Sequence, residues 1–409
     1  MDKKTILVVG AGISGITTAI EAAEVGHEVV LVERLPYLGG RVAQLGRYFP
    51  KLCPPYCGLE INFRRIKNNP RVQVHTSTEL VSIRGDRGAY TVELLQKPQY
   101  VNDRCTACGA CVEVCPVTRD DDFNYGLTTT KAIYLPHEMA YPYRYAIDTS
   151  VCMKLECKKC VDACAYRAID FSRQDQRFEV KVHSVVLATG WTPYDATKIE
   201  NLRYGSYRNV ITNVQMERLL AANGPHQGLI LRPSDAKAPE SIAFVQCAGS
   251  RDDNHLPYCS TVCCLASMKH ALEYRERNPQ GKAFIFYIDL RAMGRNEDVL
   301  SRVKADENIV LIKGKVARID EEPCGSLVVE AEDILSGLKR KEKVGMVVLA
   351  TGMTPNLPAL DKVVVDEFGF FNAEAVEEGI FAAGCDKAPL DVSSALKDAT
   401  GMALKAIQG

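Results

Sequence analysis

The sequence predicts an α/β protein with two parallel-sheet domains, the first of which is interrupted by a small α+β insert. Three observations support this prediction. The apolar run Thr5–Val9 leads into a glycine-rich turn and a helical pattern, and two later stretches, residues 187–190 and 349–352, repeat a strand followed by Ala-Thr-Gly. Eight cysteines crowd the segment between residues 105 and 164. A chain of 409 residues can form two or three domains, each with its own core.

The first glycine-rich turn has the spacing of a dinucleotide-binding fingerprint. Gly10, Gly12 and Gly15 allow a tight turn, close approach of the backbone to a pyrophosphate, and close packing of helix on strand. Residues 27–32 form a second predicted strand, which ends at Glu33, an acid placed to hydrogen-bond a ribose hydroxyl. A turn without a ligand is the alternative, but strand, helix and acid together favour a nucleotide site.

The eight cysteines have the spacing of iron–sulfur ligands. The first group precedes Pro116 and reproduces the bacterial ferredoxin run, in which three thiolates hold one cube and the fourth reaches the other: Cys105, Cys108, Cys111 and Cys115. The second group has a first gap two residues longer, and Ala165 replaces the usual proline: Cys152, Cys157, Cys160 and Cys164. The expected pairing crosses over, so that Cys164 joins the first cube and Cys115 the second. Zinc or buried thiols are the alternatives, but one zinc ion needs only four ligands.

The order of motifs in the whole chain resembles the two-dinucleotide-domain flavoproteins of the glutathione and thioredoxin reductase type. Leu-Gly-Gly-Arg at residues 38–41 follows the acid, the two Ala-Thr-Gly turns come next, and residues 380–386 match the family's C-terminal motif, whose acid holds the ribityl chain of the flavin. The resemblance implies FAD bound by Gly10, Gly12, Gly15, Glu33, Arg34, Gly40, Arg41, Ala188, Thr189, Gly190, Thr351, Gly352, Gly384 and Asp386. Asp386 also has the position of a cap for the final helix.

The positions of these motifs predict five segments. Residues 1–99 and 172–240 form the first two parts of an FAD-binding domain, the second including a loop-rich connection from residue 197. Residues 100–171 form an inserted bacterial-type 2[4Fe-4S] ferredoxin domain, and residues 241–344 a degenerate NAD(P)-type domain. Residues 345–409 are expected to complete the FAD-binding domain.

The middle domain lacks the expected nicotinamide fingerprint. Strands are predicted at residues 241–246 and 283–289, but the loop after the first reads Gln-Cys-Ala-Gly-Ser-Arg in place of a second GxGxxG. This region carries four closely spaced cysteines, which we expect to ligate a third [4Fe-4S] cluster: Cys247, Cys259, Cys263 and Cys264. A catalytic thiol, a disulfide, or burial of the cysteines as small apolar residues are the alternatives.

Cys53 and Cys57 form a separate pair, for which two interpretations remain. They could be a redox-active dithiol near the flavin, but Pro54 and Pro55 stiffen the segment between them. This favours a structural or cluster-supporting role.

Composition restricts the partners and the compartment. The net charge is −1, so nothing points to nucleic acid or to an anionic membrane surface. Sixteen cysteines in ligand-like groups favour metal binding in a reducing cytoplasm over a disulfide framework.

No run of about eighteen apolar residues occurs, so we expect no direct membrane span. The N-terminus has no cleavage-site pattern, so we expect no export signal. The histidines have no paired spacing, so haem ligation is not expected.

With the cysteine-rich loop and the insert, the whole chain resembles the A subunit of heterodisulfide reductase. Its length and residues 49–57 look closest to the A subunit of the quinone-interacting membrane-bound oxidoreductase complex of sulfate reducers. The resemblance implies a cytoplasmic FAD and iron–sulfur subunit, held at the membrane by partner subunits, that relays electrons between a quinone pool and a soluble sulfur-metabolism reductase. The implied partners are a second flavoprotein, a quinone-reactive membrane subunit, and a soluble reductase such as adenylylsulfate reductase.

Two other functions stay open. One is an NAD(P)H-dependent oxidoreductase subunit of the glutamate-synthase small-subunit type, which the missing second fingerprint disfavours. The other is an assembly scaffold with structural cofactors. The sequence assigns no catalytic residue, and it leaves open the direction of electron flow, electron bifurcation by the flavin, and the oligomeric state.

Overall fold

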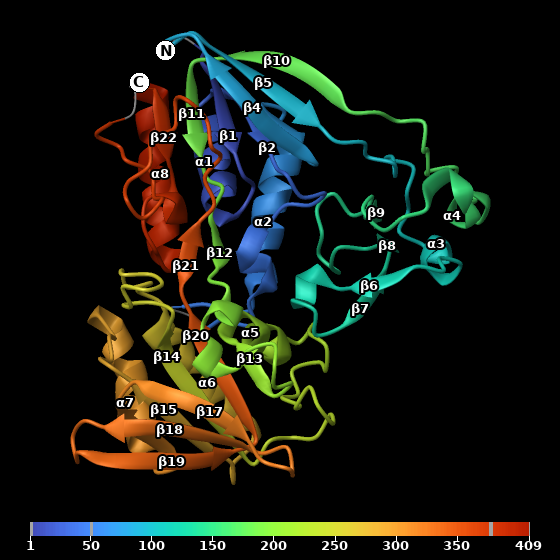
Figure 1. The fold of residues 1–409 in the computed structure, drawn as a ribbon. Helices are drawn as coiled ribbons and strands as arrows, with labels where there is room; N and C mark the ends of the chain where they lie inside the picture. Colours follow the sequence, from blue (N-terminus) through green and yellow to red (C-terminus); the bar gives the residue numbers. More distant parts are fainter. Residues whose placement is uncertain (1–2, 50–51, 376–378, 409) are drawn as a thin grey trace.

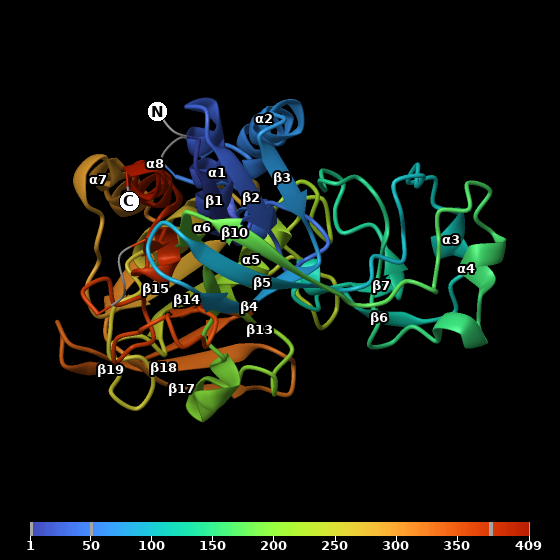
Figure 2. The same ribbon diagram turned by 90° about the horizontal axis from the view of Figure 1, so that it is seen from above.

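The computed structural model describes residues 3–49, 52–375 and 379–408 and consists of two α/β lobes with an insert at the side of the first (Figure 1). Figure 2, seen from above, shows the insert projecting away from both lobes. This arrangement confirms the predicted fold class, two nucleotide-binding-type domains with an α+β insert.

The first lobe is built on a parallel sheet with the strand order β22-β11-β1-β2-β3. The strands are β1 (Thr5–Val9), β2 (Glu28–Val32), β3 (Val72–His75), β11 (Ser184–Leu187) and β22 (Ile380–Ala382). Helices α1 (Ile13–Glu24), α2 (Pro55–Asn68) and α8 (Val392–Gln408) cover one face. An antiparallel sheet of β4 (Thr78–Arg84), β5 (Tyr90–Gln96) and β10 (Gln176–Val182) covers the other. Because both faces are buried, β1 and β2 are almost continuously apolar.

The insert leaves the first lobe after β5 and returns at β10. It contains two hairpins, β6 (Thr118–Asp120) with β7 (Thr129–Lys131) and β8 (Ile133–Tyr134) with β9 (Ala146–Ile147), and two one-turn helices, α3 (Ala110–Glu113) and α4 (Lys159–Asp162). Its small core combines a few apolar side chains, among them Tyr100 and Phe171, with cysteines. A core this small depends on bound metal for stability.

The second lobe has its own parallel sheet in the order β13-β20-β14-β15-β16. The strands are β13 (Val210–Thr212), β14 (Ser241–Ala248), β15 (Lys282–Tyr287), β16 (Ile309–Lys313) and β20 (Met346–Thr351). Helices α5 (Asn213–Leu220), α6 (Cys263–Arg277) and α7 (Glu297–Ala305) lie on one face. The antiparallel strands β17 (Val316–Glu321), β18 (Leu327–Asp333) and β19 (Leu338–Val344) lie on the other.

Short 3-10 segments lie between these elements. They are η1 (Gly40–Gln44), η2 (Asp122–Asn124), η3 (Lys154–Glu156), η4 (Ala196–Lys198), η5 (Glu200–Leu202), η6 (Gly294–Asn296) and η7 (Gly384–Asp386).

Two predicted domain boundaries are wrong. Strand β20, expected in residues 345–409 of the first domain, lies inside the second sheet, where Val348 pairs with Ile211 of β13 and Phe244 of β14. The physical reason is that all six residues of β20 are buried, which requires a central strand with a neighbour on each side. Strand β13 and helix α5, expected in residues 172–240, also belong to the second lobe. The chain passes between the lobes at β12 (Trp191–Pro193) and β21 (Met353–Pro355), which pair antiparallel.

Among the described residues, none of the helices combines the length and the apolar character needed to cross a membrane.

Candidate flavin and iron–sulfur sites

The fingerprint glycines form one compact turn at the carboxyl end of β1. A side-chain carbon added at Gly10 would lie 2.3 Å from the Ala188 carbonyl oxygen, and one at Gly15 would lie 1.8 Å from the Gly10 carbonyl oxygen. These two glycines therefore serve helix and strand packing. At Gly12 the added carbon would meet only Gly40 Cα, at 4.0 Å. The space in front of Gly12 is thus open, as a pyrophosphate at the start of α1 requires.

Asp386 closes the same site from the C-terminal part of the chain. Its carboxylate is fully buried and accepts hydrogen bonds from the N–H groups of Thr189 (2.7 Å) and Gly190 (2.6 Å) and from the Thr189 hydroxyl (3.0 Å). Burial raises the pKa of Asp386 to about 7, although these hydrogen bonds act in the opposite direction. Gly384 approaches α1, since an added carbon there would lie 2.2 Å from Ser14 Oγ. The predicted residues that follow β11 and those of η7 therefore meet at the fingerprint turn.

Glu33 and Arg41 make contacts that the sequence did not indicate. The Glu33 carboxylate accepts hydrogen bonds from the N–H groups of Ala11 (2.7 Å) and Leu35 (2.8 Å), so it connects the ends of β1 and β2. Burial raises the pKa of Glu33. Arg41 donates through Nε to the Trp191 carbonyl oxygen (3.3 Å) and through Nη1 to the Tyr125 hydroxyl (3.1 Å). Arg34 is exposed.

Thr351 and Gly352 lie in the second lobe. They stand at the carboxyl end of β20 in the second lobe, and a carbon added at Gly352 would lie 2.5 Å from Ser250 Oγ and 2.8 Å from Ser260 Oγ. The Thr351 carbonyl oxygen accepts from Cys263 Sγ at 3.6 Å. The structure therefore places these two residues against the cysteine-rich loop, because β20 belongs to the second sheet. Their contact with the flavin stays a prediction.

The first expected cluster site is a cavity in the insert. Its lining includes the cysteines of the first loop and one cysteine from the second group, as the crossover pairing predicts: Cys105, Cys108, Cys111 and Cys164. Burial, reinforced by the neighbouring Cys105, Cys160 and Cys108 thiols, raises the pKa of Cys111 to about 12. Four thiols around one enclosed space fit a [4Fe-4S] cube.

The second expected site lies beside the first. Burial, together with the neighbouring Cys152 and Cys115 thiols, raises the pKa of Cys160 to about 11. Cys115 therefore faces the second group, although it follows the first in sequence. Cys152 Sγ accepts from the Lys154 N–H at 3.4 Å, a contact that would favour a thiolate.

The cysteine-rich loop of the second lobe gathers its four cysteines at the carboxyl end of β14 and the start of α6. Burial, and after it the neighbouring Cys264 thiol, raises the pKa of Cys247 to about 11. Burial also raises the pKa of Cys263, which lies next to the other three thiols, those of Cys247, Cys264 and Cys259. Cys263 and Cys264 contact different carbonyl oxygens, those of Thr351 (3.6 Å) and Asp289 (3.4 Å). Among the residues described, no three His, Cys, Asp or Glu side chains converge closely enough to hold a single metal ion.

The loop after β14 lies where the glycine-rich turn lies in the first lobe, and its glycine packs against another part of the protein. A carbon added at Gly249 would lie 2.6 Å from the Tyr194 ring, which also hydrogen-bonds His255 through its hydroxyl (2.8 Å). Gly249 therefore makes space for an aromatic side chain of the protein itself.

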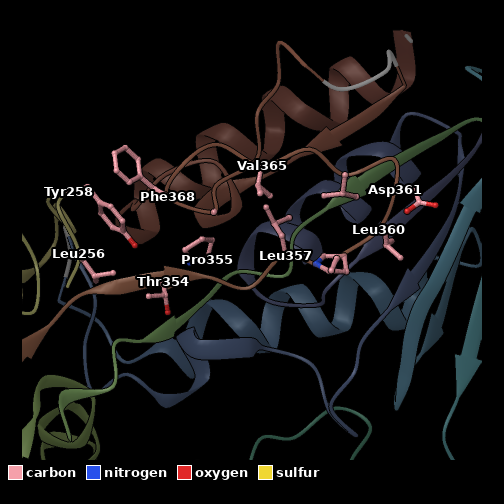
Figure 3. Close-up of a pocket in the computed structure, with 13 residues that line it drawn as sticks. Leu256, Tyr258, Thr354, Pro355, Leu357, Leu360, Asp361, Val365 and Phe368 are labelled. Carbon is pink, nitrogen blue, oxygen red and sulfur yellow. The ribbon is translucent and has the colours of Figure 1, made fainter. Parts of the chain in front are cut away.

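A surface hollow of about 700 Å³ opens next to this loop. Figure 3 shows its floor formed by the segment that begins at Thr354 and its end closed by Leu256 and Tyr258. The Tyr258 ring packs edge-on against the rings of Phe368 and Phe370, with distances between ring centres of 5.4 Å and 5.2 Å. No residue predicted from the sequence lines this hollow, but Tyr258 directly precedes Cys259.

Cys53 and Cys57 both lie close to Tyr48, whose pKa is raised by burial and then by these two thiols. Cys57 is exposed in the first turn of α2. Pro50 and Lys51, between Phe49 and this pair, lie outside the described residues. A structural or cluster-supporting role for the pair stays a prediction.

A buried ionic cluster, which the sequence did not indicate, lies at the junction of the lobes. Glu217 on α5 contacts Lys269 Nζ (2.5 Å) and His270 Nε2 (2.6 Å) on α6 and accepts from the Gly46 N–H (2.9 Å) of the first lobe. One signal could have located the helix. Thr212 and Gln215 have the spacing of a capping box, and the structure contains both of its hydrogen bonds.

Comparison with known proteins gives consistent results. Residues 5–59 match a family model for FAD dependent oxidoreductases, and residues 98–117 and 149–167 match models for 4Fe-4S binding domains. FAD and two [4Fe-4S] clusters are therefore cofactors of this chain. The fold is similar to that of a thioredoxin reductase from T. acidophilum, with a TM-score of 0.55 at 14% identity over 99% of both chains.

Two curated relatives match nearly the whole chain. The iron-sulfur A subunit of a CoB–CoM heterodisulfide reductase of Methanopyrus kandleri is 38% identical over 98% of this chain. The A subunit of an H2:CoB-CoM heterodisulfide, ferredoxin reductase of Methanothermobacter thermautotrophicus is 33% identical over the same share. This chain spans 63% of the length of each of these relatives.

Proposed function

Because this chain belongs to the family of heterodisulfide reductase A subunits, we propose that it is the flavin and iron–sulfur electron-transfer subunit of a multi-subunit oxidoreductase. FAD, when bound, exchanges electron pairs with one partner and single electrons with iron–sulfur clusters. The observation that carries the proposal is the placement of both kinds of site on one chain. The Leu38 N–H, beside the fingerprint turn, donates to the Tyr141 carbonyl oxygen of the insert at 2.9 Å.

A third [4Fe-4S] cluster at Cys247, Cys259, Cys263 and Cys264 is part of this proposal. Three observations support it. The four thiols are neighbours, Cys263 and Cys264 occupy the first turn of α6, where the helix dipole favours negative charge, and Arg251 lies beside Cys247. A cube offers each thiolate its own iron, so adjacent cysteines with different directions can bind separate corners.

For the physiological context, we propose electron relay between a membrane quinone pool and a soluble sulfur-metabolism reductase. The similarity of residues 49–57 to the quinone-interacting complexes supports this proposal. The partners would be a second flavoprotein, a quinone-reactive membrane subunit, and a reductase such as adenylylsulfate reductase. The chain would then be cytoplasmic and held at the membrane by these subunits. The two relatives from methane-producing organisms are named for a different acceptor, the CoB–CoM heterodisulfide.

The experiment that tests the proposal compares electron donors. Anaerobically purified protein, loaded with flavin and clusters, is titrated with NADH and NADPH and, separately, with a reduced quinol or a reduced partner protein from the same native complex. We expect slow or no flavin bleaching with the nicotinamides, because the loop after β14 lacks a second GxGxxG fingerprint, and rapid bleaching with a partner. Rapid stoichiometric bleaching by NADH would instead support the glutamate-synthase type of function.

A further inference from the structure

The loop of hairpin β6–β7 is the place where the insert touches both lobes. We call residues 121–128 the junction turn. Figure 1 shows the hairpin on the side of the insert that faces α5. The turn is ordered by its own Asp121, whose carboxylate accepts from the Phe123 N–H (3.0 Å), Asn124 Nδ2 (2.8 Å) and Thr128 Oγ1 (3.1 Å). It therefore presents its outward-facing groups in a fixed arrangement.

The first lobe holds the junction turn through Gln44 and Arg41. Gln44 Nε2 donates to the Phe123 carbonyl oxygen (3.2 Å), and Gln44 Oε1 accepts from the Tyr125 hydroxyl (2.8 Å). Arg41 Nη1 donates to the same hydroxyl at 3.1 Å. Gln44 and Arg41 belong to η1, which begins at Gly40 of the expected flavin site.

The second lobe holds the turn through Arg218 of α5, a side chain with no exposed surface. Its Nε donates to Asn124 Oδ1 of the insert (2.9 Å), its Nη1 to the Gln44 carbonyl oxygen of the first lobe (3.2 Å), and its Nη2 to the Asn223 carbonyl oxygen (3.0 Å). The guanidinium also lies 4.6 Å from the centre of the Phe123 ring. Arg218 therefore bonds to all three parts of the molecule.

A buried guanidinium of this kind contributes geometry more than stability. Burying the charge is costly, and the hydrogen-bond acceptors of Arg218 are neutral oxygens of Asn124, Gln44 and Asn223. Apolar residues of similar volume often stabilise a core as well as buried charges do. The rigid planar fork of arginine, in contrast, fixes the relative orientation of three acceptors.

We propose that Arg218 is a positioning residue that sets the distance between the clusters of the insert and the flavin of the first lobe. The inference rests on the proposed electron-transfer function. Strand β6 connects the junction turn directly to the segment that carries Cys115, an expected ligand of the second cluster. A fixed turn therefore fixes the insert against η1, and electron tunnelling rates fall exponentially with distance.

The test compares Arg218→Met with wild-type protein, both purified anaerobically and matched for flavin and iron content. The flavin is photoreduced by a flash, and the rate of internal electron transfer to the clusters is measured from the absorbance changes of flavin and clusters that follow. We expect this rate to fall about tenfold or more, since a misplacement of about 1 Å between reacting groups can slow a reaction about a hundredfold. Amide hydrogen exchange in residues 121–128 should become faster, and this second readout needs no electron transfer.

Further variants separate positioning from folding. Asn124→Ala removes the bond from Arg218 on the insert side, together with the two bonds that Asn124 Nδ2 donates inside the turn to Asp121 and Thr128. It leaves Arg218 in place, so it should reproduce the slower transfer even if Arg218→Met does not fold. The effect of the double variant on the transfer rate should be smaller than the sum of the two single effects, because both changes remove the same contact between Arg218 and Asn124. Arg218→Lys keeps the charge without the planar fork and should recover only part of the rate. Arg177→Met is the matched control, because Arg177 forms an exposed pair with Glu93 (2.8 Å), and it should leave both readouts unchanged.

Two results would overturn the inference, and they differ. A wild-type transfer rate in fully loaded Arg218→Met and Asn124→Ala proteins would show that these residues do not position the cofactors, even if exchange in the turn became faster. Absence of flavin-to-cluster transfer in the wild-type protein would overturn the proposed function, and the inference with it.

Discussion

Glu217 and Lys269 form an ion pair at 2.5 Å in which both side chains are less than 10% exposed. The pair also joins the two lobes, because Lys269 Nζ donates to the Arg47 carbonyl oxygen at 2.6 Å and Glu217 accepts from Gly46 of the same segment. Burial acts to raise the pKa of Glu217, but Lys269 and His270 more than offset it, so the carboxyl group titrates well below its ordinary range.

Glu217→Gln should therefore reduce the free energy of unfolding by about 3–5 kcal/mol, because it leaves the Lys269 ammonium buried without a counter-charge. The contribution of a depressed carboxyl pKa is present above the unfolded-state pKa and is lost as the pH falls through the folded-state pKa. The difference between variant and wild type should thus be constant at neutral pH and shrink in acid. Urea unfolding at several pH values measures it. Glu60→Gln, which breaks an exposed pair with Arg64, is the control and should cost less than about 1 kcal/mol.

Gly12→Val should abolish flavin binding and leave the clusters of the insert in place. An added carbon at Gly12 meets no protein atom closer than 4.0 Å, so the fold tolerates the substitution while the side chain occupies the space for the pyrophosphate. Flavin absorbance and iron content measure the two effects. Gly15→Ala is the contrasting variant, since its carbon would lie 1.8 Å from a carbonyl oxygen and should destabilise the whole lobe. Full flavin occupancy in folded Gly12→Val would mean that the flavin binds elsewhere.

Iron content decides whether the second lobe holds a cluster. Two cubes require about eight irons per chain and three cubes about twelve. Anaerobically purified protein should contain close to the higher figure, and Cys259→Ala combined with Cys263→Ala should lose one cluster's iron while flavin content stays unchanged. Cys324→Ala is a suitable control, because Cys324 is exposed on the far antiparallel sheet. The lower figure in wild type and variant alike would exclude the third cluster.

The flavin-free protein should become less stable as the pH rises from about 5 to about 8. Burial raises the pKa of Asp386 from the ordinary range of a carboxyl group to about 7, and the stabilising contribution of a carboxyl group with a raised pKa is lost as the pH rises through that value. The loss should amount to about 3 kcal/mol over this range. Asp386→Asn removes the titration, so its stability should vary less with pH. Equal pH dependence in the two proteins would contradict the assignment.

The motifs with local chemistry could be read from the sequence. The strand at Thr5–Val9 has the predicted bounds, and the crossover pairing matches the neighbours of Cys164 and Cys115. The placement of β20 could not be read in this way, because an apolar strand followed by Ala-Thr-Gly fits the centre of either sheet. Which sheet it joins depends on pairing with β13 and β14, more than 90 residues away.

Contacts at the junction of the three parts were also beyond the sequence. Glu217 and Arg218 are two charged residues in a short helix, a pattern typical of a solvent-exposed face. Both are buried because α5 packs against the other two parts of the molecule. A carbon added at Gly46 would lie 3.1 Å from the Glu217 carbonyl oxygen, and the Arg218 guanidinium lies 4.6 Å from the centre of the Phe123 ring. This burial arises from the assembly of separate lobes, which no local pattern encodes.

The strand pairs at which the chain leaves and re-enters the first lobe have a consequence for the evolution of the chain. The insert leaves and returns through β5 and β10, whose ends Gln96 and Gln176 face each other, and the second lobe does so through β12 and β21, where Trp191 faces Pro355. The insert and the second lobe thus each begin and end at neighbouring points on the first lobe. A gene segment coding for either one could be lost, gained or replaced while the flanking ends remain within reach of a short linker. The first lobe can therefore act as a host to which redox modules are added or exchanged without rebuilding its own sheet.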